Sequence, residues 1–535
     1  MNQIKSPLLL AVGLAAGILI GFAFSKPDSD SKGLSISLQK FKEVLTQIDR
    51  NYVDEVDTEE LVETAIVHML DKLDPHSVYI SAEDKVLANE DLQGNFEGIG
   101  IEFNIFKDTI VVISPLSGGP SEAAGLRAGD KIIEVDGKVI AGTNLTNRDV
   151  QRYLKGPKDS KVKIGIARKG SKDLIEFEII RDRIPQYSVD ASYLIDDITG
   201  YIKISRFSAT TYAEFKEALT KLKEKGMERL ILDLQGNPGG YMNHAIKIAD
   251  EFLPEERKIV YTKGKEFKFD SEANTEFLGD FEKGPLMVLV NEGSASASEI
   301  VSGALQDNDR AIIVGRRTFG KGLVQLPINI SDGSEIRLTI SRYYTPSGRS
   351  IQKPYNDNDH YGEDIMNRYT NGELFNSDSI KFADSLKYET LKGRVVYGGG
   401  GIMPDYFIPL DTNQNSVYLN KLFNYNAVQE FAFKYYEENK SKLEKMEYDD
   451  FRKNFEMSKS MFEQLAKIGE TNGVKKDTED INKNKDLIEL HIKAQIARRV
   501  WGNDGFYPIF NETNEVLQGA VKLFDKSEEL ERAEF

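Results

Sequence analysis

The chain has 535 residues, more than one hydrophobic core usually organises, so several domains are expected. Its formal net charge of −17 is spread over segments of mixed sign, which argues against nucleic acid as the main partner. The sequence has no cysteine and five scattered histidines, which excludes disulfides, thiolate metal sites and a cysteine nucleophile. We predict neither a metal site nor a cofactor.

The first element is an uncharged apolar run over residues 8–24, which follows Lys5 and precedes a polar segment. The run is shorter than the roughly 20 residues of a usual membrane span, and it fits either a signal peptide or an N-terminal anchor. No A-x-A cleavage pattern follows it, so we favour the anchor. Lys5 on the short side then places the N-terminus in the cytoplasm and the main body outside it.

Residues 36–92 follow a helical pattern, with one apolar stripe from Leu38 to Tyr52 and a second from Leu61 to Leu73. The LDPHSVYIS segment that ends the second stripe contains Asp74 and His76, which suggest either a metal or catalytic site or a simple turn. We interpret the segment as a turn, because an Asp-Pro step ends helices and an aspartate accepts hydrogen bonds from nearby backbone amides.

Short strands replace helices between residues 96 and 181, where a Gly-Ile-Gly-Ile run opens a strand and GGPSEAAGLRAGDKIIEVDG follows at 118–137. The second run closely resembles the A-G-L-x-x-G-D turn and strand of PDZ domains; a small barrel of other use is the alternative. A PDZ domain binds chain ends because the amides of its loop point at a terminal carboxylate while its strand edge pairs with the peptide. A helix over 147–154 is expected to form the other groove wall, and the apolar loop suggests an apolar last residue. The residues expected to bind the peptide carboxylate are Gly98, Ile99, Gly100 and Ile101.

From Tyr201 onwards, strands and helices alternate. The apolar strand RLILDL ends in a glycine turn at 236–240 and passes into a helix at Met242. Such a turn leaves unpaired amides at a helix N-terminus, which suits an oxyanion. The GNPGG string is similar to the GNSGG of trypsin-like proteases, but Pro238 stands where the nucleophile would be, which excludes that chemistry. We interpret His244 as a helix-surface histidine.

The stretch from Pro285 to Leu326 combines a buried strand over 286–290, the small-residue turn GSASAS, a helix from about Ser296, a second strand over 311–314 and a lysine between two glycines. A serine hydroxyl needs an adjacent base and donors for the developing oxyanion before it can act as a nucleophile. The turn offers three serines, Ser294, Ser296 and Ser298, among which the residues alone do not choose. A serine-rich helix N-cap is the alternative interpretation.

Lys321 is the candidate base, because none of the five histidines has a suitable setting. A lysine can accept a proton near neutral pH only if burial lowers its pKa from about 10.4 by several units. The flanking glycines and the apolar residues Phe319, Leu323 and Val324 are consistent with a dry site. Gln325, four residues on, projects to the same side and can orient the amine without adding charge.

The ordered motifs LDLQGNPGG, VNEGSASASEI, GRRTFGKGLVQ, YYTPSGRSIQ and GGGIMPD follow the PDZ segment. Their order resembles the carboxyl-terminal processing peptidases, or tail-specific proteases, over roughly residues 36–411. Members of this family are Ser/Lys endopeptidases that cut proteins near their C-termini. The resemblance implies that Ser296 is the nucleophile, Lys321 the base and Gln325 the residue that orients it.

The resemblance also implies an oxyanion hole made of the Ala297 amide and an amide from Gly239 or Gly240. One departure from the family pattern is Gln235, where the family usually has arginine. This departure puts a local ion pair in doubt but not the chemistry.

The predicted fold is multidomain α+β: an N-terminal helical segment, a PDZ β-barrel-like domain, an α/β peptidase core with ClpP/crotonase-like layers, and a C-terminal helical extension. The predicted boundaries are a cytoplasmic tip at 1–6, a transmembrane anchor or signal peptide at 7–24, a linker at 25–35, an N-terminal helical region at 36–92, a PDZ domain at 93–182, a Ser/Lys peptidase core at 183–411 and a C-terminal helical region at 412–535.

We therefore predict a serine endopeptidase that cleaves proteins near their C-termini and captures apolar tails with its PDZ domain. The alternative is a catalytically inactive PDZ scaffold, against which the presence of all three candidate residues argues. Expected partners are protein substrates with unstructured C-terminal tails and, through the anchor, a membrane; a homodimer and an adaptor protein are further candidates. The expected location is the bacterial cell envelope, with the catalytic body in the periplasm, or outside the cell after export.

Overall fold

The structure is a computed structural model that describes residues 29–524, apart from positions 117, 169, 356–360, 381–382 and 412–415. It divides into two compact units, Met1–Leu73 and Asp74–Phe535. The predicted cytoplasmic tip and apolar leader lie outside the described residues. Within the part of the chain that is described, no helix is both long enough and apolar enough to cross a membrane.

The first unit contains α2 (Ser29–Asn51) and α3 (Thr58–Asp71). α3 begins after Asp57, whose carboxylate caps the helix by accepting hydrogen bonds from the amides of Glu59 and Glu60. Both helices follow the predicted apolar periodicity, yet much of that apolar surface is exposed. The exposed apolar side chains on these helices are Leu34, Ile36, Leu38, Phe41, Val44, Leu61, Val67 and Met69.

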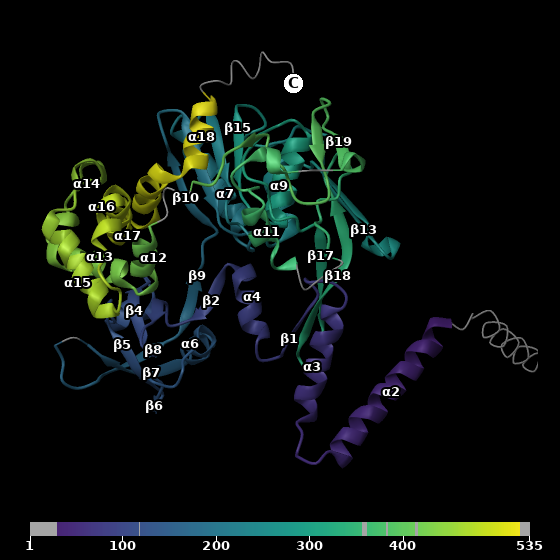
Figure 1. Cartoon of the computed structure of the whole chain (residues 1–535), viewed down its shortest axis with the longest axis horizontal. Coiled ribbons are helices and arrows are strands. Elements are labelled where there is room, and N and C mark those ends of the chain that lie inside the picture. The colour runs from purple at the N-terminus through teal and green to yellow at the C-terminus, as the bar shows by residue number, and fades with distance from the viewer. Residues whose placement is uncertain are drawn as a thin grey trace, which may run out of the picture. The chain divides into compact units, whose positions relative to one another are not determined.

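The second unit begins with a short strand, a helix and the PDZ domain (Figure 1). The PDZ sheet has the order β3-β4-β5-β7-β8, with β6 paired to β5, and the separate strands β2 and β9 pair with each other. The helix predicted over 147–154 is confirmed as α6. The elements are β1 (Val78–Ile80), α4 (Lys85–Gln93), β2 (Asn95–Gly98), β3 (Ile101–Ile105), β4 (Ile110–Pro115), α5 (Pro120–Ala124), β5 (Lys131–Val135), β6 (Lys138–Val139), α6 (Asn147–Leu154), β7 (Lys161–Ala167), β8 (Ile175–Ile180) and β9 (Asp182–Pro185).

The peptidase core is built on a six-stranded sheet of order β10-β11-β12-β15-β16-β21, in which every neighbouring pair except β10 and β11 is parallel. Side chains of α7, α8 and α9 pack on one face, and α18 packs on the other. Because both faces are covered, the central strands are continuous apolar runs such as LMVLV. The elements are β10 (Val189–Leu194), β11 (Thr199–Ile204), α7 (Thr211–Glu224), β12 (Arg229–Asp233), α8 (Met242–Asp250), β15 (Leu286–Val290), α9 (Ala297–Asp307), β16 (Ile312–Gly315), β21 (Tyr406–Phe407) and α18 (Glu515–Phe524).

A second core sheet has the order β1-β18-β13-β14, with β17 paired to β18. The turn predicted for LDPHSVYIS is therefore only partly correct, because Val78–Ile80 pairs with β18 as a strand. Several short elements lie within the segment 353–397. The elements of this part are β13 (Lys258–Gly264), η1 (Phe267–Phe269), β14 (Ser271–Asn274), β17 (Leu323–Asn329), β18 (Glu335–Tyr344), α11 (Asp364–Thr370), η2 (Ser377–Ser379), η3 (Asp384–Leu386), β19 (Lys387–Glu389) and β20 (Val395–Tyr397).

The C-terminal region is helical, as predicted, and has a hydrophobic core of its own. The polar stretch around 472–486 contains a short helix, which Asp477 caps by accepting a hydrogen bond from the Asp480 amide. The longest helix is kinked at Gly502, where φ is +65°. The elements are α12 (Val417–Asn424), α13 (Ala427–Leu443), α14 (Tyr448–Asn454), α15 (Lys459–Asn472), α16 (Thr478–Lys483), α17 (Lys485–Phe510) and η4 (Asn511–Thr513).

Candidate active site

Three turns meet at the carboxyl ends of β12, β15 and β16, the edge where open α/β sheets bind their ligands. They are the glycine turn after β12, the serine turn before α9 and the lysine loop before β17. The Ala295 amide of the serine turn donates to the Asn237 carbonyl of the glycine turn at 2.9 Å. The Phe319 amide of the lysine loop donates to the Ser294 carbonyl, also at 2.9 Å. The serine turn therefore lies between the other two.

The three serines of this turn have different environments. The Ser294 hydroxyl donates to the Leu234 carbonyl at 2.7 Å, and the Ser298 hydroxyl donates to the Asn237 carbonyl at 2.9 Å. Both side chains are fully buried. Ser296 is partly exposed, and its hydroxyl donates to no residue that the structure describes. Its backbone has φ +54° and ψ −113°, a conformation that residues with a Cβ rarely adopt.

Glu299, in the first turn of α9, joins the serine turn to the lysine loop. Its Oε2 accepts hydrogen bonds from the amides of Ser296 at 2.9 Å and Lys321 at 2.8 Å. Its Oε1 accepts from the Gly320 amide at 2.7 Å and the Thr318 hydroxyl at 2.5 Å. The side chain is completely buried, and burial raises its pKa to about 7 even though these four donors each lower it.

Tyr343, on β18, forms a second connection between the same two residues. Its hydroxyl donates to the Lys321 carbonyl at 2.6 Å and lies 3.0 Å from the Ser296 carbonyl. The side chain is 1% exposed. One carboxylate and one phenol thus contact the backbones of Ser296 and Lys321, so the two residues lie next to each other.

The Lys321 side chain is partly buried, and its amine makes no hydrogen bond or ion pair with any residue in the described part of the chain. Burial lowers the pKa of Lys321 below its ordinary value of 10.5. The charges of Glu299 and Asp74 oppose this effect, and that of Arg337 adds to it. The net direction favours a neutral amine, as expected of a base in a buried setting.

Gln325 lies on β17, next to an irregularity in the pairing of β17 with β18 between Val324 and Gln325. Its Nε2 donates to the Thr339 hydroxyl at 3.1 Å, and that hydroxyl in turn donates to Asp74 at 3.1 Å. The observed partner of the Gln325 amide is therefore Thr339, and its predicted role toward the lysine amine stays a prediction.

The glycine turn packs directly against the serine turn. Gly239 has φ +102°, and a Cβ there would lie 2.7 Å from the Cβ of Ser296, so the close approach requires glycine. The Gly239 amide donates to the Asn237 side chain at 2.9 Å. The amides of Gly240 and Ala297 donate to no residue among those described, and the Ala297 amide opens α9. Of the two glycine amides predicted for the oxyanion hole, that of Gly240 is the one left free.

The chain is similar to a carboxy-terminal-processing protease of Bartonella bacilliformis. The two are 37% identical over 350 residues, which cover 64% of this chain and 78% of the relative. The chain belongs to the family of carboxy-terminal-processing proteases.

The chain is also similar to a second relative, to a solved structure and to several family models. The carboxyl-terminal-processing protease of Synechocystis sp. is 40% identical over 299 residues, which cover 54% of this chain and 68% of the relative. A solved photosystem II D1 C-terminal processing protease is 29% identical, with a TM-score of 0.35, and covers 58% of this chain and 89% of its own. Models of known families match the N-terminal domain of the activating protease CtpB at residues 23–84, a PDZ domain at 111–168, peptidase family S41 at 198–360 and a family of unknown function at 418–502.

This carboxy-terminal-processing protease is a serine-type endopeptidase with a PDZ domain, as predicted, and the inactive-scaffold alternative is not supported. In its PDZ domain, Gly98 pairs with Lys155 at the end of α6. The Ile99 side chain is 2% exposed, and its carbonyl accepts hydrogen bonds from Ser121. Ile99 therefore lies in the domain core, whereas Ile101 stays partly exposed. The predicted carboxylate-binding role of Gly98, Ile99, Gly100 and Ile101 stays a prediction.

Asp74 and His76 lie close to Lys321, which the sequence did not indicate. His76 Nε2 forms a 2.9 Å hydrogen bond with the Tyr361 hydroxyl, while Asp74 Oδ1 accepts from the His76 backbone amide at 2.8 Å. Burial, and then the charge of Lys321, lower the pKa of His76 to about 4. Because the aspartate bonds the backbone rather than the ring, these residues do not form a Ser-His-Asp arrangement.

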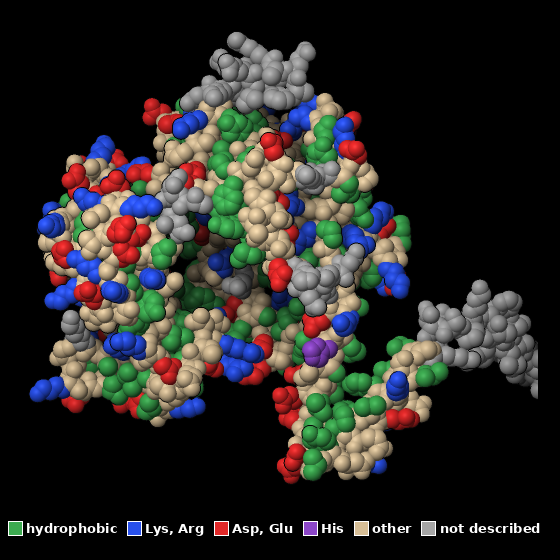
Figure 2. All heavy atoms as spheres, in the orientation of Figure 1, with side chains coloured by type: hydrophobic (Ala, Val, Ile, Leu, Met, Phe, Trp, Pro, Cys, Tyr) green, Lys and Arg blue, Asp and Glu red, His purple; other side chains and the backbone are tan. Residues whose placement is uncertain are grey.

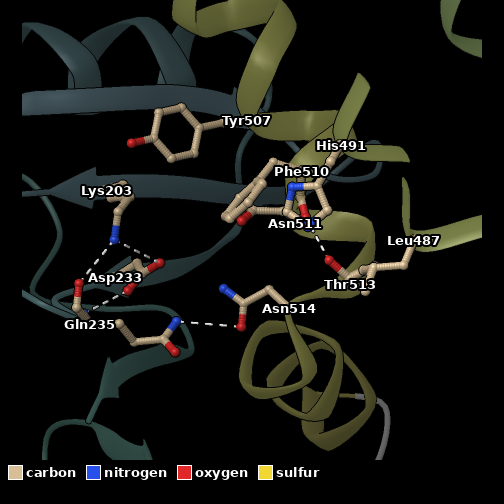
Figure 3. Close-up of a pocket in the computed structure, with 10 residues that line it drawn as sticks. All are labelled: Lys203, Asp233, Gln235, Leu487, His491, Tyr507, Phe510, Asn511, Thr513 and Asn514. Atoms are coloured by element: carbon tan, nitrogen blue, oxygen red, sulfur yellow. Dashed lines mark hydrogen bonds and ion pairs between the residues drawn. The ribbon is translucent and has the colours of Figure 1, made fainter. Parts of the chain in front are cut away.

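A cavity of about 340 Å³ lies at the carboxyl ends of β11 and β12, against the C-terminal helices (Figure 3). Its lining does not include Ser296 or Lys321. The amine of Lys203 lies 3.5 Å from the Asp233 carboxylate and 3.1 Å from the Gln235 carbonyl, so the cation of this cavity already has partners. The lining residues are Lys203, Asp233, Gln235, Leu487, His491, Tyr507, Phe510, Asn511, Thr513 and Asn514.

Proposed function

We propose that this protease cleaves protein substrates near their C-termini, with Ser296 as nucleophile and Lys321 as general base. The observation that carries the proposal is the pair of connections between these residues. Glu299 accepts from both of their amides, and the Tyr343 hydroxyl contacts both of their carbonyls. Such fixed geometry supplies the proximity on which a Ser/Lys pair depends.

In the proposed reaction, the neutral amine of Lys321 takes the hydroxyl proton of Ser296, and Oγ attacks the carbonyl carbon of the scissile peptide bond. The amides of Ala297 and Gly240 stabilise the resulting oxyanion. Collapse of this intermediate releases the amine product, which receives the proton from Lys321, and leaves an acyl-enzyme. Water, deprotonated by Lys321, then hydrolyses the ester and restores Ser296.

The test compares Ser296→Ala and Lys321→Ala with Ser302→Ala on an unfolded protein such as β-casein. Ser302 is a matched control, because it is a fully buried serine of α9 whose hydroxyl donates only to the Ser298 carbonyl within that helix. The first two variants should lose measurable cleavage, whereas Ser302→Ala should stay within about tenfold of the wild type. Wild-type cleavage by Ser296→Ala or Lys321→Ala would contradict the proposal.

Capture of substrate tails by the PDZ domain is a further part of the proposal. The partly exposed Ile101 on β3 and the helix α6 supply the two walls expected of a peptide groove. A reporter ending in an apolar residue should therefore be cleaved with a lower KM than the same reporter ending in aspartate. Equal KM values for the two reporters would contradict tail capture.

We also propose a cell-envelope location with the catalytic body outside the cytoplasm, supported by the apolar run at 8–24 behind Lys5. The full chain should fractionate with membranes, and deletion of residues 1–24 should release it. An adaptor protein that delivers substrates is a further proposed partner.

A homodimer is proposed through the first unit. Figure 2 shows hydrophobic side chains on the surface of α2 and α3, and Leu38 and Phe41 of α2 are 60% and 43% exposed. Exposed apolar stripes of this kind mark interaction surfaces. A second copy of the same helices is the proposed occupant, because an isologous contact buries identical stripes on both chains.

A further inference from the structure

We propose that Asp74, acting through Thr339, is a positioning residue that fixes the orientation of the Gln325 amide and thereby presents its oxygen to the amine of Lys321. The inference rests on the proposed roles of Ser296 and Lys321. It adds two residues to the reaction, one of them from the turn between α3 and β1.

The geometry is a chain of three side chains across two strands. Gln325 on β17 stands opposite Thr339 on β18 in the strand pairing. Gln325 Nε2 lies 3.1 Å from Thr339 Oγ1, which lies 3.1 Å from Asp74 Oδ1. The Thr339 amide also donates to the Ser77 hydroxyl at 3.1 Å, and this hydroxyl donates to Asp74 Oδ2 at 2.7 Å. Thr339 is therefore held to the Asp74 turn by both its backbone and its side chain.

The direction of these hydrogen bonds follows from which atoms carry protons. An ionised carboxylate only accepts, and a threonine hydroxyl has one proton to donate. Asp74 is 5% exposed and receives that proton from Thr339. Thr339 can then only accept from Gln325, which must turn its NH2 group toward Thr339 and its Oε1 away. Without the carboxylate, the amide could equally well take the flipped orientation.

A fixed Oε1 matters because a neutral lysine amine has two protons and one lone pair. Donation of one proton to Oε1 orients the amine, which leaves the lone pair available for the Ser296 proton. The neutral amide does this without adding a charge that would hold the lysine protonated. Oε1 forms no hydrogen bond with any described residue in the structure.

Besides orienting the Gln325 amide, the Asp74 charge raises the pKa of Lys321, which disfavours the neutral amine. This opposing effect distinguishes a positioning role from a merely structural one. The charged groups that act on Lys321 are Glu299 and Asp74, which raise its pKa, and Arg337, which lowers it. His76, on the same turn as Asp74, stays neutral above about pH 4. Removal of the Asp74 charge should therefore make the lysine easier to deprotonate, and removal of the whole carboxyl group should also release the Gln325 amide.

The main experiment is a double-mutant cycle between Thr339→Val and Gln325→Ala in the full chain, with kcat and KM measured on a quenched peptide that ends in an apolar residue. We expect Thr339→Val to lower kcat 10- to 100-fold with little change in KM, and Thr339→Ser to restore it to within about threefold. In the Gln325→Ala background, Thr339→Val should have no further effect, because Thr339 acts through Gln325. Additive losses, or a wild-type kcat for Thr339→Val, would overturn the proposal.

Asp74→Asn supplies an independent readout. Asparagine keeps the Oδ1 that accepts from the amides of His76 and Ser77, so the turn is preserved. The same Oδ1 accepts from the Thr339 hydroxyl, and the NH2 group replaces Oδ2, which faces the Ser77 hydroxyl. Asparagine therefore removes the charge and keeps the orientation of the Gln325 amide, whereas Asp74→Ala removes both the charge and the acceptor. We expect kcat to stay within about threefold for Asp74→Asn and to fall at least tenfold for Asp74→Ala, while the acidic limb of kcat/KM moves to lower pH in both. An unchanged kcat for Asp74→Ala would overturn the proposal.

Two controls complete the design. Thermal unfolding shows whether each variant is folded, and Thr339→Ala enters the same cycle if Thr339→Val is not. The design distinguishes failure of the proposed roles of Ser296 and Lys321 from failure of this inference. If Ser296→Ala or Lys321→Ala still cleaves, the proposed function is wrong, whereas loss of cleavage in both with an additive cycle overturns only the positioning role.

Discussion

Glu299 shows how one side chain can set both the geometry and the electrostatics of this site. Its two oxygens accept four hydrogen bonds from the serine turn and the lysine loop. A sequence signal for it existed, because Ser296 and Glu299 have the S-x-x-E spacing of a capping box at the start of a helix. The serines alone indicated an N-cap, and the role of Glu299 was not predicted.

The raised pKa of Glu299 predicts how stability depends on pH. The carboxyl ionises near 4.5 when unfolded and at about 7 when folded, so its stabilising contribution is complete below 4.5 and is lost as pH rises toward 7. The loss amounts to about 3 kcal/mol at roughly 1.4 kcal/mol per pKa unit. The unfolding free energy of the wild type relative to Glu299→Gln should therefore fall by this amount between pH 4.5 and 7.5 in urea titrations. Exposed Glu438→Gln is the control, and a pH-independent difference for Glu299→Gln would contradict the prediction.

Lys321 predicts the pH dependence of activity. A base acts only when it is neutral, so kcat/KM should rise with pH through the lysine pKa, which burial places below 10.5. Lys321→Arg should be inactive across the range from pH 6 to 10, because a guanidinium keeps its proton. The measurement is a pH profile of peptide cleavage by both proteins. Activity of the arginine variant at any of these pH values would contradict a proton-accepting role.

Gly239 permits a matched comparison within one turn. Gly239 and Gly236 both have positive φ, but only at Gly239 would a Cβ meet the serine turn, 2.7 Å from Ser296 Cβ. We expect Gly239→Ala to lower kcat/KM by about 100-fold, because displacement of a reacting group by an ångström has effects of that order. Gly236→Ala carries backbone strain without a collision, so it should cost stability and leave kcat/KM within about threefold. Equal losses of activity in the two variants would contradict this account.

Local sequence patterns were sufficient to predict those elements whose structure depends on residues nearby in the sequence. The helix over 147–154 and the strand over 286–290 have the predicted bounds, because a capping box and an unbroken apolar run are local signals. The strand β1 was missed, because its three residues become a strand only by pairing with β18, far along the chain. The placement of Asp74 beside Thr339 depends on the same pairing, so no local pattern could have indicated it.

Replacement of Tyr343 tests how strongly the serine turn and the lysine loop depend on their contact with β18. Its buried hydroxyl contacts the carbonyls of Ser296 and Lys321. Tyr343→Phe leaves both carbonyls without this partner, so we expect a loss of about 1–3 kcal/mol in unfolding free energy. Cleavage should fall at least tenfold as the two backbones separate. The neighbouring Tyr344→Phe is the control for urea unfolding and peptide cleavage. Unchanged stability and cleavage in Tyr343→Phe would argue that its hydroxyl does not hold the Ser296 and Lys321 backbones together.

At the scale of the whole molecule, the proposed homodimer can be tested by changing the exposed surface of the first unit. Leu38→Glu combined with Phe41→Glu places charges on the exposed apolar stripe of α2. If this stripe joins two copies, the variant should be monomeric in light scattering at concentrations where the wild type is dimeric. Lys42→Glu on the same helix is the matched control. A monomeric wild type, or a dimeric double variant, would contradict the proposal.

The unusual backbone of Ser296 implies a conflict between catalysis and stability. With φ at +54° and ψ at −113°, the position suits glycine better than any residue with a side chain. Ser296→Gly and Ser296→Ala both lack the proposed nucleophile, but only glycine relieves the strain, so the glycine variant should be about 1 kcal/mol more stable than the alanine variant. This protease therefore retains, at the position proposed to react, a residue that selection for stability alone would replace.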